Sequence, residues 1–264
     1  MELILNTLVF LFGLAVGSFS NVCVGRWHEG TSVVSPGSHC DTCGHAIKWY
    51  ENIPVLSYLY LKGKCSHCHV ELSLQYPLIE FITGCSFLAI YSIYGLSANC
   101  LLLMFVTWLF IVATVSDINY REIPNELTLI SIPVMILTVV FNINSVEAVL
   151  FGIAPAVLIT IFMLIGSIAN PAFIEYLGGG DIKFLFSVGG IMGIGFVLVL
   201  LFVSCFVLVL VYASYIIEDA VTDKQTYVPM MVGFGITYFL MMMMHYLSSP
   251  QFDVLRLLGF FYIY

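Results

Sequence analysis

The 264-residue chain is 61% hydrophobic and only 9% charged, whereas about a quarter of the residues in soluble domains are charged. A soluble fold of this length cannot bury so much apolar surface, so the composition excludes ordinary water-soluble classes and predicts a membrane protein. The net charge of −8 and the lack of any basic run in the sequence also predict no nucleic-acid partner, because phosphate backbones require clustered Lys and Arg.

Stretches of about 20 apolar residues predict membrane-spanning helices. The first stretch lacks the basic segment of a secretory signal, and we interpret it as a retained helix. A shorter apolar segment after a glycine run is expected to form a further helix. We therefore predict an all-α polytopic membrane protein with about eight transmembrane helices, at 3–24, 77–95, 99–116, 126–142, 146–166, 182–194, 196–217 and 229–247.

The distribution of positive charge predicts the orientation in the membrane. The chain has eight Lys and Arg, and four of them lie in its one long hydrophilic loop, 26–76. With eight helices, every basic residue except Arg256 falls on one side, which the positive-inside rule makes cytoplasmic. We predict a first transmembrane helix at 1–25, a small cytoplasmic zinc-binding domain at 26–76 between helices 1 and 2, and a helical membrane domain at 77–264.

Two cysteine pairs of the form Cys-x-x-Cys lie in this loop. Paired turns of this kind direct four thiolates at one tetrahedral ion, and a cytoplasmic location keeps thiols reduced, which favours a metal over disulfides. A module of about 50 residues with few apolar side chains also needs a cross-link such as a bound metal to fold. Four nearby histidines leave a mixed Cys/His site open. The predicted structural zinc ligands are Cys40, Cys43, Cys65 and Cys68.

Two aspartates are expected at the cytoplasmic end of the hydrophobic region. Asp117 ends a long apolar helix, and Asp181 follows Gly178-Gly179-Gly180 and precedes Ile182-Lys183. Acidic side chains close to the hydrocarbon region of a membrane are energetically costly, so their presence requires an explanation. Two close carboxyl groups can share a proton, so that the ionised one activates water and the protonated one polarises a scissile carbonyl. The glycines would let the backbone approach an extended substrate.

A structural interpretation of the same aspartates remains open. An Asp at a helix end is often a cap. Arg121 and Lys183 also lie close in sequence to Asp117 and Asp181, so both acids can serve as ordinary boundary charges. Glu80, within an expected span, is unusual enough to be functional or to pair with a cation of the loop.

Across nearly its whole length, the chain resembles the type IV prepilin leader peptidase/N-methyltransferases. The likeness rests on a series of short motifs in one order. These are Gly17-Ser18-Phe19-Ser20-Asn21-Val22, Asn52-Ile53-Pro54-Val55-Leu56-Ser57-Tyr58, Lys62-Gly63-Lys64-Cys65, Tyr76-Pro77-Leu78-Ile79-Glu80, Ile123-Pro124-Asn125-Glu126-Leu127-Thr128, Gly178-Gly179-Gly180-Asp181-Ile182-Lys183 and Gly189-Gly190-Ile191-Met192-Gly193.

The resemblance implies a multifunctional enzyme of the bacterial cytoplasmic (inner) membrane, with active sites facing the cytoplasm. Asp117 and Asp181 would form the catalytic pair of a Gly-x-Gly-Asp intramembrane protease without a metal at the peptidase centre, and the four cysteines would hold zinc. The substrates would be prepilins or pseudopilins of type IV pilus or secretion systems, cut between a basic leader and a hydrophobic helix. A second activity would methylate the new N-terminus with S-adenosylmethionine.

Two other classes of function fit parts of the pattern. Intramembrane carboxylates and glycine-broken helices also occur in ion-coupled transporters, but the paired broken segments in two matching halves are missing from this sequence. A membrane thiol oxidoreductase would use the Cys-x-x-Cys pairs, yet the charge rule places them on the reducing side. Ion flux without proteolysis would favour the first class, and metal-free redox-cycling thiols the second.

Overall fold

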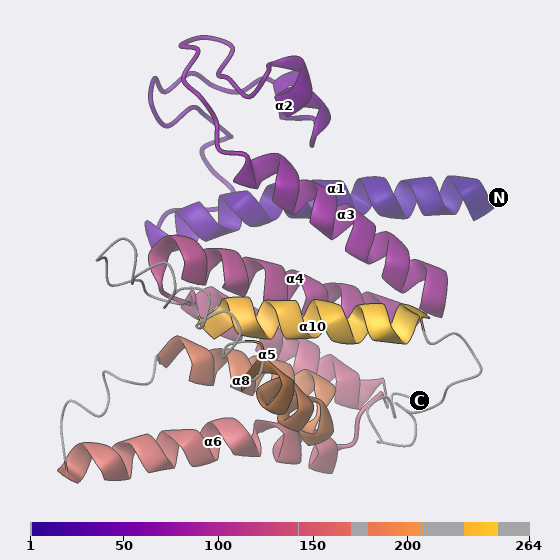
Figure 1. Cartoon of the computed structure of the whole chain (residues 1–264), viewed down its shortest axis with the longest axis vertical. Coiled ribbons are helices and arrows are strands. Elements are labelled where there is room, and N and C mark those ends of the chain that lie inside the picture. The colour runs from indigo at the N-terminus through magenta and orange to yellow at the C-terminus, as the bar shows by residue number, and fades with distance from the viewer. Residues whose placement is uncertain (1, 142, 170–178, 206, 208–229, 248–264) are drawn as a thin grey trace. The chain divides into compact units, whose positions relative to one another are not determined.

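The computed structural model describes residues 2–141, 143–169, 179–205, 207 and 230–247. Among these residues all the regular elements are helices, and the loop after the first helix is irregular apart from two short helices and two isolated bridges. The helices labelled in Figure 1 are α1 (Glu2–His28), α2 (Leu56–Tyr60), α3 (Gln75–Tyr94), α4 (Ala98–Tyr120), α5 (Asn125–Val140), α6 (Val146–Ala169), α8 (Gly179–Met192) and α10 (Met230–Leu247). A short 3-10 helix, η1 (Trp49–Asn52), precedes α2.

In the part of the chain that the structure describes, three helices are long and apolar enough to cross a bilayer, namely α1, α3 and α4. The prediction of a mostly helical chain with apolar helices of membrane-spanning length is therefore confirmed. Shorter apolar helices follow at Asn125–Val140, Val146–Ile161, Ile194–Cys205 and Met231–Met242. Parts of the expected spans 196–217 and 229–247 lie outside the described residues, and a total of eight spans stays a prediction.

The chain divides into two compact units, Met1–Val112 and Ala113–Tyr264, with the boundary inside α4. In the first unit, α1 packs along α3 (Figure 1). Glycines make this approach possible, because a Cβ atom at Gly17 would lie 2.7 Å from the Cα of Glu80 and one at Gly13 would lie 2.8 Å from the Cα of Gly84. Small residues at such a seam let two apolar helices associate through close backbone contact.

In the second unit, α8 packs against α6 and α5. Gly152 of α6 meets Gly189 of α8 backbone to backbone, leaving no room for a side chain at either position. The Ser131 hydroxyl donates to the Ser187 hydroxyl at 3.0 Å, which ties α5 to α8. These contacts fix the helix that carries Asp181 in its first turn.

Candidate functional site

The four cysteines of the two Cys-x-x-Cys turns lie together. Their sulfur atoms are all within 4.8 Å of one another, and the Sγ atoms of Cys40 and Cys68 are 3.8 Å apart. Tetrahedral coordination with Zn–S bonds of about 2.3 Å requires sulfurs about 3.8 Å apart, so the donor set fits a single such ion. The group contains cysteines only, and two of the neighbouring histidines, His45 and His67, stack on each other with ring centroids 4.9 Å apart.

The two turns have the same backbone hydrogen bonds. The N–H of Gly44 donates to the carbonyl of Cys40 at 2.8 Å, and the N–H of His69 donates to that of Cys65 at 3.1 Å. Gly44 and His69 both have a positive φ, of 68° and 58°. A residue in the left-handed conformation closes each turn, and glycine adopts this backbone conformation more easily than histidine. The backbone is therefore arranged for metal binding at both turns.

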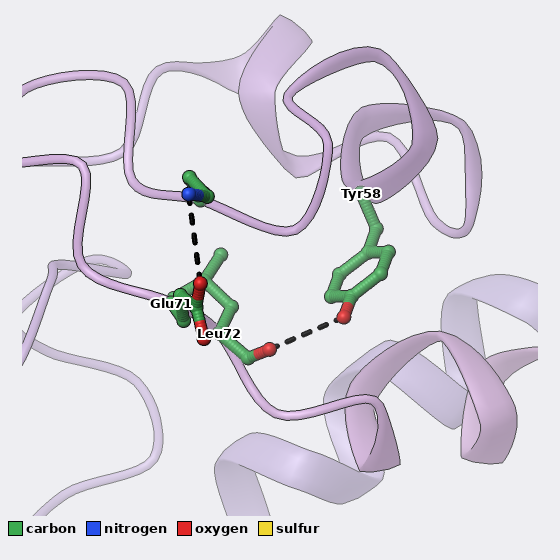
Figure 2. A network of polar contacts seen from close by, with 4 residues as sticks. Tyr58, Glu71 and Leu72 are labelled. Carbon is green, nitrogen blue, oxygen red and sulfur yellow. Dashed lines mark hydrogen bonds and ion pairs between the residues drawn. The ribbon is translucent and has the colours of Figure 1, made fainter.

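Further contacts hold the module together. The Tyr58 hydroxyl donates to the carbonyl oxygen of Leu72 at 3.2 Å, and Lys64 forms an ion pair with Glu71 at 3.5 Å (Figure 2). The backbone N–H of Val55 donates to the Oε2 atom of Glu80 at 2.6 Å. This bond joins the loop to the buried face of α3, where the Glu80 side chain is only 8% exposed.

Asp117 lies one turn before the end of α4 and is almost completely buried, with 6% exposed. Its Oδ2 atom accepts a hydrogen bond from the backbone N–H of Met231, in the first turn of α10, at 2.9 Å. The charge of Arg121, four residues later, also acts on it. Asp117 therefore binds the N-terminus of α10. This contact resembles the capping role that the structural interpretation gives to an aspartate at a helix end.

Asp181 lies in the first turn of α8 and is partly buried. The side chains of Asp117 and Asp181 are close enough to interact electrostatically. The start of α8 is held near the end of α4 because Gly180 packs on Ile123, where an added Cβ would lie 3.1 Å from the Ile123 Cγ1 atom. Two carboxyl groups placed in this way can share a proton and act as an acid–base pair.

The substrate-approach loop predicted from the sequence is only partly described. Gly178 lies outside the described residues, Gly179 is exposed, and Gly180 and Lys183 are partly buried on α8. The hydrogen bond between Asp117 and Met231 was not predicted, because no local sequence signal links residues so far apart. The role of Glu80 as an acceptor for the loop backbone was also missed, although a carboxylate within a span signals a need for a partner.

Fold and site together define a helical membrane protein that carries a four-cysteine module and a pair of interacting aspartates. Two family models match the chain: the bacterial peptidase A24 N-terminal domain over residues 11–94 and the type IV leader peptidase family over residues 103–214. The chain belongs to the type IV leader peptidase family, a family of enzymes.

Similar proteins named prepilin leader peptidase/N-methyltransferase occur in several bacteria. The Bacillus subtilis protein is 29% identical over 83% of this chain and 86% of its own length. The Vibrio cholerae protein is 30% identical over 75% of this chain and 81% of its own length. The Myxococcus xanthus protein is 38% identical over 46% of this chain and 36% of its own length. No solved structure matches the chain.

Proposed function

We propose that the chain is a prepilin peptidase that removes the basic leader from type IV prepilins or pseudopilins with Asp117 and Asp181. The observation that carries the proposal is that these two carboxyl groups, which come from separate helices, lie close enough to interact electrostatically. Membership of the type IV leader peptidase family supports the reaction class, and the names of the relatives support the substrate class.

In the proposed reaction, the ionised carboxylate of the pair takes a proton from a water molecule, and the water oxygen attacks the scissile carbonyl carbon. The protonated carboxyl group donates a hydrogen bond to the carbonyl oxygen and stabilises its developing charge. The proton then passes to the leaving nitrogen as the C–N bond breaks. Because the two groups titrate as a pair, either aspartate can take either role.

The Met231 N–H restrains the carboxyl group of Asp117, since one of its oxygens is committed to that bond. A catalytic group held in this way spends less of its time in unproductive orientations. The packing of Gly180 on Ile123 would restrain the partner helix similarly. This arrangement supports a dyad positioned before substrate arrives.

We place the reaction at the cytoplasmic face of the bacterial inner membrane. The basic residues of the 26–76 loop and of the segments after α4 and at α8 lie on one side if the apolar helices form about eight spans, and that side is cytoplasmic by the charge rule. A substrate with a basic leader and a hydrophobic helix would then enter from the bilayer and leave its leader beside the dyad. The domain division at 1–25, 26–76 and 77–264 belongs to this proposal.

The four-cysteine module would hold a structural zinc ion, with Cys40, Cys43, Cys65 and Cys68 as ligands. The spacing of the sulfurs and the matching backbone turns support this assignment. Zinc would supply the cross-link that a small module with a limited core needs. No step of peptide hydrolysis requires it.

We also propose that the protein methylates the new N-terminus with S-adenosylmethionine. The names of the relatives in Bacillus subtilis and Vibrio cholerae include this activity and support the proposal.

The reaction is tested by incubating the purified full chain in detergent with a prepilin and mapping the product termini by mass spectrometry. A cut between the leader and the hydrophobic helix that persists with the metal chelator 1,10-phenanthroline supports aspartyl chemistry. Complete inhibition by the chelator while the protein remains folded would contradict it. Intact prepilin together with ion flux in proteoliposomes would instead favour a transporter.

A further inference from the structure

The cysteine module presents apolar side chains outward on its one short α-helix. In α2, Leu56, Leu59 and Tyr60 are 63%, 65% and 84% exposed. These positions are three and four residues apart, so they share one face of the helix. The opposite side turns inward: the Ser57 hydroxyl is buried and donates to the carbonyl of Tyr50 at 3.1 Å.

The 3-10 helix η1, which contacts α2, also exposes aromatic side chains. Trp49 is 81% exposed and Tyr50 is 47% exposed, and their rings meet edge to face with centroids 5.7 Å apart. The Lys48 ammonium group lies over the Tyr50 ring, 5.7 Å from its centroid. We call Trp49, Tyr50, Leu56, Leu59 and Tyr60 the outer aromatic face.

A module in water is not expected to expose these side chains while it buries serine. The usual amphipathic helix places its apolar stripe on the core and its polar side outward. Here Tyr58, not the outward residues, provides the inward contact of α2, through its bond to Leu72 (Figure 2). A contiguous exposed apolar surface indicates a partner or a lipid surface.

The attachment of the module favours lipid as the occupant. Its chain leaves α1 at His28 and enters α3 at Gln75, and both helices are membrane spans packed against each other. Both ends of the module are therefore held at the same bilayer boundary. Exposed apolar side chains also occur where the module joins α3, at Leu74 just before the helix and at Leu78 and Phe81 in its first turns, so apolar surface continues from the module's end onto a helix that lipid covers.

The composition of the face also matches a bilayer interface. Trp and Tyr prefer the headgroup region, where an apolar ring and a polar edge are both satisfied, and a lysine can extend towards the headgroups. We infer that the outer aromatic face inserts into the headgroup region of the membrane that holds α1 and α3, so that the cysteine module lies on the lipid surface. The partner is the bilayer itself.

The test uses the fluorescence of Trp49 in the full chain. Substituting the other two tryptophans, Trp27→Phe and Trp108→Phe, leaves Trp49 as the only reporter. The protein is placed in nanodiscs of phosphatidylcholine and phosphatidylglycerol with a nitroxide either near the headgroup or deep in the acyl chain, and iodide serves as the aqueous quencher. Retention of metal by the module confirms that each variant is folded.

We expect strong quenching by the shallow nitroxide, weaker quenching by the deep one and little by iodide. A Leu59→Ser/Tyr60→Ser variant is expected to lose most of the lipid quenching. The matched control Val34→Ser removes another exposed apolar side chain of the module, 86% exposed and outside the face, and is expected to leave the quenching unchanged.

Three results would overturn the inference. Full quenching by iodide with none from lipid would place the face in water. Protection from both kinds of quencher would show that another part of the chain or a second copy covers it. Equal lipid quenching in the Leu59→Ser/Tyr60→Ser variant and in the parent would show that these side chains do not hold Trp49 at the interface.

Discussion

Glu80 of α3 accepts a hydrogen bond from the backbone N–H of Val55, 2.6 Å away, and thereby ties a membrane helix to the cysteine module. Val55 has a positive φ of 62°, a strained conformation for a β-branched residue. The strain is maintained because the buried carboxylate fixes the N–H at this position. The bond gives this carboxylate within a span a structural role.

Removing this acceptor is expected to loosen the module. A hydrogen bond to a charged group contributes about 1.5–3 kcal/mol, so Glu80→Ala should lower the free energy of unfolding by about that amount. Glu80→Gln retains an acceptor oxygen and should cost less. Thermal unfolding in detergent measures both, with Glu147→Gln, an exposed acid at the start of α6, as the control. Equal stability of Glu80→Ala and the control would contradict the anchoring role.

The close packing of α1 on α3 can be tested by comparing two single glycine substitutions in α1. Gly17→Ala places a Cβ 2.7 Å from the Glu80 Cα, and backbone cannot move aside cheaply, so we expect a loss of about 1–3 kcal/mol. Gly25→Ala has open space around the new Cβ and should be neutral or slightly stabilising. Similar unfolding temperatures for the two variants would show that the helices do not pack this closely.

Metal removal is expected to destabilise the module selectively, so that it opens more often although the cysteine turns still form. Chelation, or the double substitution Cys40→Ser/Cys43→Ser, removes the cross-link between the two turns, so residues 29–74 should become sensitive to limited proteolysis while α1 and α3 stay protected. Cys85→Ser provides a control, because this cysteine is exposed on α3 and outside the cluster. Unchanged protease resistance of the module after chelation would mean that it folds without metal.

In the metal-free cluster, the Cys65 thiol should ionise at a lower pH than an ordinary cysteine. Hydrogen bonds from the backbone N–H groups of Cys68 and then His67 lower the pKa of Cys65 from 9.0 to about 6. Because the folded pKa is depressed, the thiolate contributes stability above pH 9.0, and that contribution is lost as the pH falls through about 6. Alkylation of Cys65 by iodoacetamide, followed by mass spectrometry, should therefore remain fast down to about pH 6.

The unfolded chain is the reference for this titration. There the same cysteine should react with a midpoint near its ordinary pKa of 9.0, since the two backbone donors are no longer fixed. Identical profiles for the folded and unfolded chain would show that the turn does not stabilise the thiolate.

Much of the helical framework could be predicted from the sequence because long apolar runs leave few alternatives. The expected helices at 3–24, 77–95 and 99–116 correspond to Glu2–His28, Gln75–Tyr94 and Ala98–Tyr120. The expected helices stop too early at their polar ends, for example at residue 24 and not at His28. Each helix continues beyond its apolar run, because its end reaches water and polar residues can extend it there. The segment expected at 182–194 begins earlier, at Gly179, since tertiary packing against Ile123 stabilises helix within the glycine run.

Contacts between distant segments could not be predicted in the same way. The bonds from Met231 to Asp117 and from Val55 to Glu80 join residues with no shared local pattern. The repeated backbone of the two cysteine turns was also hidden, because glycine closes one and histidine closes the other. The outward face of α2 contradicts the usual amphipathic pattern, so only the burial of Ser57 makes it recognisable.

The aspartate pair is tested most directly by comparing prepilin cleavage by the wild type, Asp117→Asn and Asp181→Asn, with Glu147→Gln as a matched acid-to-amide control. Asn retains the shape of the side chain but cannot act as the base, so each aspartate variant should lose about 100-fold or more in the rate of cleavage while its unfolding temperature stays near that of the wild type. The control should cleave normally. If either folded Asn variant cleaves at the wild-type rate, the aspartyl mechanism is wrong.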